Sequence, residues 1–233
     1  MLDDAFREST KHLISPVMGT EIVAPLLYNF VMMQRPRRIL EIGGGLTSIY
    51  LLKALLDSDN LFNIEKNQID NPLKNNFYYD AELKPAQLHV IDNFDHRDTA
   101  ADKLTRTASE LGLDHFLTLH NVDFVGYAEK LFKDRNAYDL LFLDCGQLSH
   151  YMHFLQNYFP LVNKNGGLIL IHSLLTNLHG QVFLKQLKLI QASSKFMEWE
   201  ILSLLEPHKS QQNSITMLRM IGEETTSIHS VMP

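Results

Sequence analysis

The sequence predicts an α/β protein built on a doubly wound, seven-stranded and mostly parallel sheet that ends in an antiparallel hairpin. Short apolar runs alternate with helical patterns along most of the chain, as strands and crossover helices do in such a sheet. Three consecutive glycines follow the first apolar run, where the chain must turn tightly from strand to helix. The last two apolar runs are joined by a link too short for a parallel crossover, so they should pair antiparallel.

The N-terminal part of the chain leads into the first strand and helix. Residues 3–34 are predicted to be helical, because "APLLYNFVMMQ" supplies an apolar stripe. Pro36 ends this helix, since it restricts Arg35 and cannot donate a backbone hydrogen bond. The run "RILEI" at 38–42 is then predicted to be a parallel strand covered on both faces, and 48–56 the helix after the glycine turn.

The remaining elements continue this alternation. Strands are expected at 87–92, 115–120, 138–144 and 166–172. Helices are expected at 98–113, 126–133, 151–162 and 180–194. The final hairpin should consist of strands at 197–205 and 212–220.

Four regions are predicted along the chain. Residues 1–36 form an N-terminal helical cap, and residues 37–220 form a Rossmann-like ligand-binding domain. Residues 57–86 interrupt the rhythm of this domain with many Asn and Asp, two prolines and several aromatics, so we expect an insertion or lid there. Its aromatics indicate either an apolar or planar substrate or a loop anchored to the domain. Residues 221–233 form a polar tail.

The composition narrows the class of protein. A formal net charge of −6 argues against binding to nucleic acid, because phosphate contacts need clustered Lys and Arg. Cys145 is the only cysteine, which leaves no disulfide framework and no thiolate metal cluster. The N-terminus is acidic without an apolar core, and no apolar run approaches the roughly 18 residues of a membrane span. We therefore expect a cytoplasmic protein that acts away from membranes.

A carboxylate, Glu41, lies two residues ahead of the glycine turn. The turn reads "GGGLTS" from Gly43, so Ser48 stands where a dinucleotide-binding turn has its third glycine. The charge of Glu41 would repel a pyrophosphate and attract a cation. S-adenosylmethionine (SAM) offers a sulfonium and an ammonium, and its carboxylate can accept backbone N–H groups at the start of a helix. A strand-end carboxylate that simply bonds a neighbouring loop is the alternative.

Acidic residues also follow the next three predicted strands. Asp92 is placed to accept the two ribose hydroxyls of a nucleoside, and Asp123 lies within reach of an adenine amine on which Phe124 could stack. Asp144 ends the fourth strand. Glu65 is an alternative to Asp92, because it lies nearer the usual spacing of roughly 20 residues from the glycines. Asp92 is preferred because a helix follows it.

These motifs resemble the class I SAM-dependent methyltransferases, and most of all their catechol and caffeoyl-CoA O-methyltransferase branch. The resemblance runs from about Ser15 to Met220 and rests on "ISPVMGTEIVAPLL", "RILEIGGGLTS" and "YDLLFLDCGQLSHYMHFLQNYFPLVNKNGGLILIHSLLTNLHG". It implies a set of SAM-binding residues. Glu41, Gly43 and Gly45 would hold the methionine part, Thr47 or Ser48 its carboxylate, Asp92 the ribose, and Asp123 with Phe124 the adenine.

The chain departs from this branch where the branch binds a divalent cation. The resemblance implies an Asp after the fourth strand and an Asp-Asn pair after the fifth, but the pair is His172 and Ser173 here, and only Asp144 is kept. Gln147 stands where the branch has a lysine base. Because Mg²⁺ prefers oxygen ligands in near-octahedral geometry, the loss of two of three ligands argues against the metal-chelation mechanism, and no metal is expected.

A His–Asp couple is the predicted general base. His172 ends the fifth strand beside Asp144, and such a carboxylate orients one ring nitrogen while the other accepts the proton of a nucleophile. His150 is the alternative base. A transition metal held by His150, His172 and Asp144 is a further reading, since two His and one carboxylate suit Fe(II) or Zn²⁺.

We therefore expect a SAM-dependent methyltransferase that acts on a hydroxyl or amine of a small molecule, with a homodimer as the expected assembly. Three alternatives remain open. The fold could consume SAM by cyclisation or aminocarboxypropyl transfer, could bind SAM without catalysis, or could bind a nicotinamide dinucleotide. Product analysis and ligand titration separate them.

Overall fold

A seven-stranded sheet forms the centre of the computed structural model, which describes residues 2–68, 85–131, 138–144, 147–193 and 199–221. The strands are β1 (Arg38–Ile42), β2 (Gln87–Asp92), β3 (Leu117–Asn121), β4 (Leu140–Leu143), β5 (Leu168–His172), β6 (Trp199–Leu205) and β7 (Ser214–Met220). Their order is β3-β2-β1-β4-β5-β7-β6. β1 to β5 pair in parallel, while β7 pairs antiparallel with both β5 and β6. The predicted fold class and terminal hairpin are confirmed.

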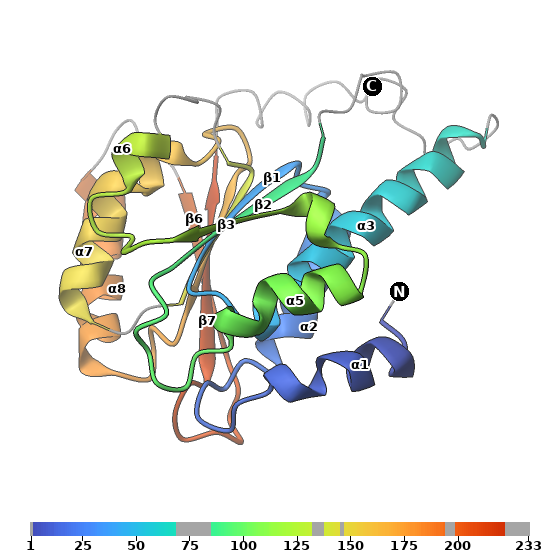
Figure 1. Ribbon diagram of the computed structural model, residues 1–233. Helices are drawn as coiled ribbons and strands as arrows, with labels where there is room; N and C mark the ends of the chain where they lie inside the picture. The colour runs from blue at the N-terminus through green and yellow to red at the C-terminus, as the bar shows by residue number, and fades with distance from the viewer. Residues whose placement is uncertain (1, 69–84, 132–137, 145–146, 194–198, 222–233) are drawn as a thin grey trace, which may run out of the picture.

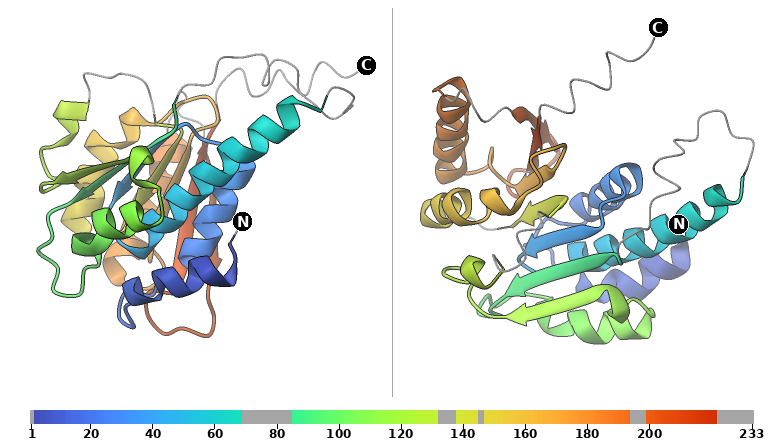
Figure 2. Two further views of the ribbon diagram at one scale, coloured as in Figure 1. Left: turned by 45° about the vertical axis from the view of Figure 1, so that its right-hand side comes forward. Right: turned by 90° about the horizontal axis from the view of Figure 1, so that it is seen from above.

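Helices cover both faces of this sheet (Figure 1 and Figure 2). One face carries α2 (Val23–Gln34), α3 (Leu46–Lys66) and α5 (Leu104–Glu110), and the other carries α6 (Ala128–Leu131), α7 (Leu148–Asn157) and α8 (Leu178–Ser193). The short helix α1 (Asp4–Thr10) lies beside α5 and α2. Single turns of 3₁₀-helix complete the described elements: η1 (Lys11–Leu13), η2 (Ala101–Lys103), η3 (Asp114–Phe116) and η4 (Phe159–Leu161).

Two hydrophobic clusters, one on each face, hold the layers together. Successive residues of β1 alternate between them, with Ile39 in the cluster under α2 and α3 and Leu40 in the cluster under α7 and α8. Every residue of β4 and β5 is buried. This explains why these strands read as unbroken apolar runs, because a parallel strand covered on both faces has no solvent-exposed positions.

The N-terminal region differs from the single helical segment expected at 3–34. Helix α1 and η1 end at Leu13, and α2 begins only at Val23. Pro16 and Gly19 lie in the intervening loop, and Gly19 has a φ of 63°, a left-handed conformation that interrupts a helix. The loop at 14–22 instead approaches the link between β6 and β7, since a Cβ on Gly19 would lie 2.4 Å from Cβ of Gln212.

The expected insertion at 57–86 is wrong over its first part, because α3 continues to Lys66. Arg35 forms a bidentate ion pair with Glu65, with its Nη2 2.8 Å from Oε1. This pair holds the end of α3 against the segment that leads into β1. Glu65 is therefore part of a helix at the far end of the domain and does not end a strand, which rules it out as the ribose carboxylate. The rest of the insertion, 69–84, and the tail from 222 onward lie outside the described residues.

The strand order reverses between β1 and β4, and this reversal positions the site. β1 has β2 on one side and β4 on the other. The connections that follow β1 and β4 therefore run in opposite directions and leave a crevice at the carboxyl ends of these two strands. None of the described helices is long and apolar enough to cross a membrane.

Candidate active site at the carboxyl ends of the strands

A cavity of about 490 Å³ lies at this reversal point, a size typical of small-molecule sites. Its walls come from the glycine turn, from the carboxyl ends of β2, β3, β4 and β5, and from two more distant segments. These are the loop at 14–22 and the link between β6 and β7. The lining residues include Ser15, Met18, Thr20, Gly43, Gly44, Gly45, Thr47, Asp92, Asp98, Asp123, Phe124, Asp144, Gln147, His150, Ser173, Asn177 and Gln212.

The glycine turn brings the backbone close to neighbouring strand ends. Gly43 has a φ of 95°, and a Cβ there would lie 3.0 Å from the carbonyl oxygen of Asp144. A Cβ on Gly44 would lie 2.9 Å from Val90, and the Gly44 N–H donates to Oδ2 of Asp92 at 2.8 Å. Gly43 and Gly45 were predicted as binding residues, whereas Gly44 was missed although the run of three glycines was visible. Its role depends on contacts with β2 that only the fold reveals.

Glu41 is fully buried and lies behind the cavity wall. Its Oε1 accepts a hydrogen bond from the hydroxyl of Thr47, which does line the cavity, while its Oε2 is buried with no hydrogen-bond partner among the described residues. Burial raises the pKa of Glu41 to about 8 against the hydrogen bonds from Ser48 and Thr47, and the nearby charges of Asp144 and Asp92 raise it further. Within the part of the chain that the structure describes, no cation therefore partners this carboxyl group.

Thr47 and Ser48 were the two candidates for binding the ligand carboxylate, and only Thr47 lines the cavity. Ser48 is fully buried, and its Oγ accepts the N–H of Gly45 at 3.0 Å, which fixes the first turn of α3. Thr47 lies on the cavity wall at the start of the same helix. The helix start thus faces the cavity, as the binding of a ligand carboxylate requires.

The three residues predicted to hold a nucleoside line the cavity together. Asp92 accepts the N–H groups of Gly44 and Phe94, at 2.8 and 2.7 Å, one on each oxygen. Asp123 accepts the N–H of Val125 at 2.7 Å. Each oxygen has a further lone pair, so these bonds orient the carboxylates without exhausting them. Phe124 lies on the same wall, edge-on to the ring of His150 at 5.3 Å.

Asp144 and His172 form the predicted couple, but the residue that faces the cavity is Asp144 and not His172. Nδ1 of His172 lies 3.0 Å from Oδ1 of Asp144. The Asp144 side chain is 20% exposed and lines the cavity, whereas His172 is 0% exposed and lies outside the lining. Burial by itself lowers the pKa of His172, but the adjacent Asp144 charge outweighs it, so the pKa lies above its ordinary value. Asp144 therefore faces a ligand, and His172 supports it from behind.

The other histidines considered on this rim are dispersed. His150 lines the cavity. His153 points elsewhere and accepts the N–H of Gly126 at 3.2 Å, and His179 is exposed outside the cavity. Among the residues the structure describes, no three His, Cys, Asp or Glu side chains are arranged to hold a metal ion, which overturns the reading of a transition metal on His150, His172 and Asp144.

The divalent cation that the resemblance implies does not fit these residues either. Ser173 donates its hydroxyl to Oε1 of Gln212, and the ring of His172 is already bonded to Asp144. One partly exposed carboxylate remains, which is too few oxygen ligands for Mg²⁺. No chemical step is derived through a metal ion.

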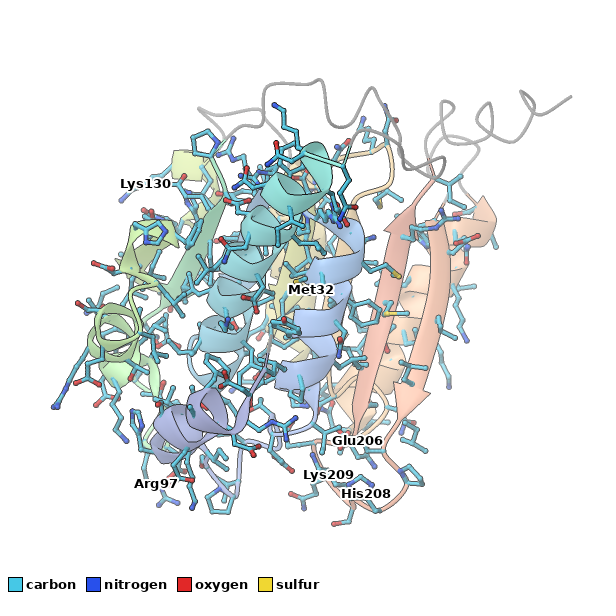
Figure 3. All side chains as sticks on the ribbon, turned by 90° about the vertical axis from the view of Figure 1, so that its right-hand side faces the viewer. Met32, Arg97, Lys130, Glu206, His208 and Lys209 are labelled. Atoms are coloured by element: carbon cyan, nitrogen blue, oxygen red, sulfur yellow. The ribbon has the colours of Figure 1, made fainter. Side chains whose placement is uncertain are left out.

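Part of the cavity wall comes from segments far apart in the sequence, one in the N-terminal region and one in the final hairpin. Lys209 joins them: its Nζ donates to the carbonyl of Gly19 at 3.0 Å and forms ion pairs with Glu21 at 2.8 Å and Glu206 at 2.9 Å. Glu206 and Lys209 lie together at the lower end of the sheet in Figure 3, on the link between β6 and β7. This cluster clamps the loop at 14–22 beside the cavity.

A doubly wound sheet of this order, with a reversed terminal hairpin and a cavity beside a glycine turn, is the class I methyltransferase fold. The family model described as "Methyltransferase domain" matches residues 40–174, and the chain belongs to this family. No curated protein sequence matches the chain significantly.

Solved structures share the fold at low sequence identity. The O-methyltransferase TomG from Streptomyces achromogenes, involved in tomaymycin synthesis and solved with SAM, has a TM-score of 0.65 and 17% identity over 95% of this chain and 92% of its own. An O-methyltransferase from Bacillus cereus, solved with S-adenosylhomocysteine, has a TM-score of 0.61 and 15% identity, with 94% and 92% covered. An rRNA methylase from Streptococcus thermophilus has a TM-score of 0.54 and 10% identity, with 90% and 100% covered.

Proposed function

We propose that this methyltransferase binds SAM in the cavity and transfers the methyl group to a hydroxyl or amine of a small molecule. The observation that carries the proposal is the buried Oε2 of Glu41, which has no hydrogen-bond partner among the described residues and lies beside a glycine turn that admits a ligand closely. A carboxylate in this position needs a cation, and SAM brings a sulfonium and an ammonium. The SAM and S-adenosylhomocysteine bound to TomG and to the Bacillus cereus enzyme support this choice.

The lining residues suit the parts of SAM in order. Asp92 would accept the ribose hydroxyls, and Asp123 with Phe124 would hold the adenine. Gly43 and Gly45 would leave room for the methionine part, and the start of α3 at Thr47 would receive its carboxylate. The acidic group of Glu41 would stabilise the positive charge from behind the wall.

Asp144 and His172 would act on the acceptor as a couple. When bound, SAM supplies an electrophilic methyl group, and the transfer needs an aligned nucleophile that loses a proton. Asp144 would accept this proton, because it alone of the pair reaches the cavity. His172 would hold the orientation of Asp144 through the 3.0 Å contact and share the proton. His150, which also lines the cavity, is the alternative base.

We further propose that the reaction proceeds without chelation of Mg²⁺, because no further oxygen ligands join Asp144 among the residues that the structure describes. Chelation with EDTA should leave turnover unchanged. A small-molecule acceptor is favoured over RNA, although an rRNA methylase shares the fold, because the chain has a net charge of −6 and phosphate binding needs clustered cations.

Calorimetric titration with SAM, S-adenosylhomocysteine and NAD tests the proposal. SAM should bind and raise the free energy of unfolding by about 2.7 kcal/mol at 100 times its dissociation constant. Asp92→Asn should weaken SAM binding, whereas Asp102→Asn, an exposed position outside the cavity lining, should not. Products separate the rivals: S-adenosylhomocysteine indicates methyl transfer, and methylthioadenosine indicates cyclisation or aminocarboxypropyl transfer. Tight SAM binding without any turnover would indicate a silent binding module.

A homodimer and a cytoplasmic location are also proposed. The strand β6 lies at the edge of the sheet and exposes Leu202, Leu204 and Leu205, which a second copy could cover. The single cysteine of the chain is typical of a reducing compartment. Light scattering after size exclusion measures the oligomeric state.

A further inference from the structure

The charge of the cavity is strongly one-sided. Its described lining contains four aspartates and neither lysine nor arginine: Asp92, Asp98, Asp123 and Asp144. Glu41 lies directly behind this wall. Clefts lined by one sign of charge concentrate their field and select ligands of the opposite sign.

The nearest described Lys and Arg side chains offset this charge only in part. Lys209 is 15% exposed and forms ion pairs with Glu21 and Glu206, so this group carries a surplus of negative charge. Arg97 is 91% exposed and lies at the lower edge of the molecule in Figure 3, with its Nε 3.5 Å from Oδ2 of Asp98. Neither side chain offers an unpaired cation to a ligand in the cavity.

SAM does not balance the acidic wall by itself. It carries two positive groups and one carboxylate, which leaves a single net positive charge against four aspartates. Asp92 and Asp123 are assigned to its uncharged ribose and adenine under the proposed function. Asp144, and Asp98 with its highly exposed partner Arg97, therefore remain for a second ligand. The lining also contains His96 and His150, and its uncharged polar residues include Ser15, Thr20, Ser173, Asn177 and Gln212.

We propose, building on the methyltransferase function above, that the acceptor is a cationic, amine-bearing small molecule and that anionic acceptors such as carboxylates, phosphates and CoA thioesters are rejected. Its ammonium binds Asp98 or Asp144. A nitrogen acceptor first loses one ammonium proton to Asp144, and the lone pair this frees forms the bond to the methyl carbon as the carbon–sulfur bond breaks. An oxygen acceptor uses a lone pair it already has and passes its hydroxyl proton to Asp144 during the transfer. In both cases the sulfur leaves as an uncharged thioether.

Two series of matched probes test this inference on the complex with S-adenosylhomocysteine. The aromatic series is benzylamine, benzyl alcohol and benzoate, and the aliphatic series is putrescine, butanediol and succinate. Calorimetry measures their binding to the complex, and S-adenosylhomocysteine formation from SAM measures their turnover. Each amine should bind at least about tenfold more tightly than its carboxylate, as field-dependent selection predicts.

Charge reversal on the wall provides the matched variant. Asp98→Lys should reduce amine binding by about tenfold or more and improve carboxylate binding, while SAM binding changes less. Asp102→Lys makes the same change in net charge at an exposed position outside the lining, and the preference for amines should remain within about twofold of the wild type.

The outcomes distinguish this inference from the function on which it rests. If SAM does not bind, the proposed function fails. If SAM binds but a carboxylate binds as tightly as its amine, or neither amine binds the complex, the cationic acceptor is refuted and the methyltransferase function stands. An equal effect of the two lysine variants would also refute it, because the selection would then reflect net charge alone.

Discussion

Replacement of Glu41 by glutamine tests the assignment of the cation site. Glu41 is fully buried, and its pKa is raised from 4.5 to about 8 by burial and by Asp144 and Asp92. The folded protein therefore holds a proton on Glu41 between these two pH values, while the unfolded chain does not. The free energy of unfolding must fall as pH rises through this window. The Glu41→Gln variant has no such group and should not lose this free energy.

The size of the loss in unfolding free energy follows from the pKa shift of Glu41. One pKa unit corresponds to about 1.4 kcal/mol, so a shift from 4.5 to about 8 predicts a loss of at most about 5 kcal/mol in the ligand-free wild type. Below the lower value the two proteins should be equally stable, because a protonated glutamate and a glutamine are similar in shape. Above about pH 8 the variant should be the more stable protein.

Urea unfolding from about pH 5 to about pH 9 measures this difference. Glu129→Gln on exposed α6 makes the same chemical change and controls for it. A Glu41→Gln stability difference that stays constant across this range would refute the burial argument, because His172 and the other titrating groups are common to both proteins. SAM binding should reverse the order, since its cations favour ionised Glu41. An ionised Glu41 and a cationic group of SAM at about 5 Å, with an effective dielectric constant of about 20, attract each other by on the order of 3 kcal/mol. The Glu41→Gln variant should therefore bind SAM about a hundredfold more weakly than the wild type.

Three further predictions follow from the same geometry. Gly43→Ala should destabilise the protein by more than Gly166→Ala and should abolish SAM binding. Both glycines have a positive φ, but only at Gly43 would a Cβ lie 3.0 Å from the carbonyl oxygen of Asp144. Urea unfolding measures the stability and calorimetry measures the binding. Lys209→Met should lower the free energy of unfolding by about 1–3 kcal/mol and raise KM by freeing the loop at 14–22, whereas Lys11→Met, 69% exposed, should change stability by less than about 0.5 kcal/mol. Added salt should weaken the binding of SAM more than that of S-adenosylhomocysteine, since only SAM carries the sulfonium charge. Titration at two ionic strengths measures both affinities. An equal change of the two affinities with salt would contradict an acidic site.

Those parts of the fold that depend on burial could be predicted from the sequence. β4 and β5 are buried at every position, and such strands appear as continuous apolar runs. The second half of α3 could not be predicted, because its polar residues show no clear period. Tertiary pairs hold it instead: Tyr28 donates to Asp57 at 2.8 Å, and Arg37 pairs with Asp59. Tyr28 lies on α2 and Arg37 lies just before β1, so the sequence around the second half of α3 does not indicate these pairs.

The candidate site divides in the same way. Asp92 and Asp144 could be named in advance, because the carboxyl ends of parallel strands meet at one edge and an acid at each end must lie there. Gln212 and Met18 could not, since they reach the cavity only through the pairing of β7 and the loop at 14–22. His172 illustrates the limit at a single position. The strand end placed it correctly beside Asp144, but the side from which it approaches is set by side-chain packing.

That Asp144 and not His172 faces the cavity bears on the chemistry. A carboxylate that faces the ligand is a weak base toward a hydroxyl or an amine, but it can also hold a cationic acceptor through its charge. An ammonium docked on Asp144 is held by its charge before reaction, and His172, whose pKa is raised by that same carboxylate, lies 3.0 Å behind it to take up the released proton. The burial of the histidine and the acidic wall are the observations behind the cationic acceptor proposed above. A neutral phenol, by contrast, would leave the charge of Asp98 unused.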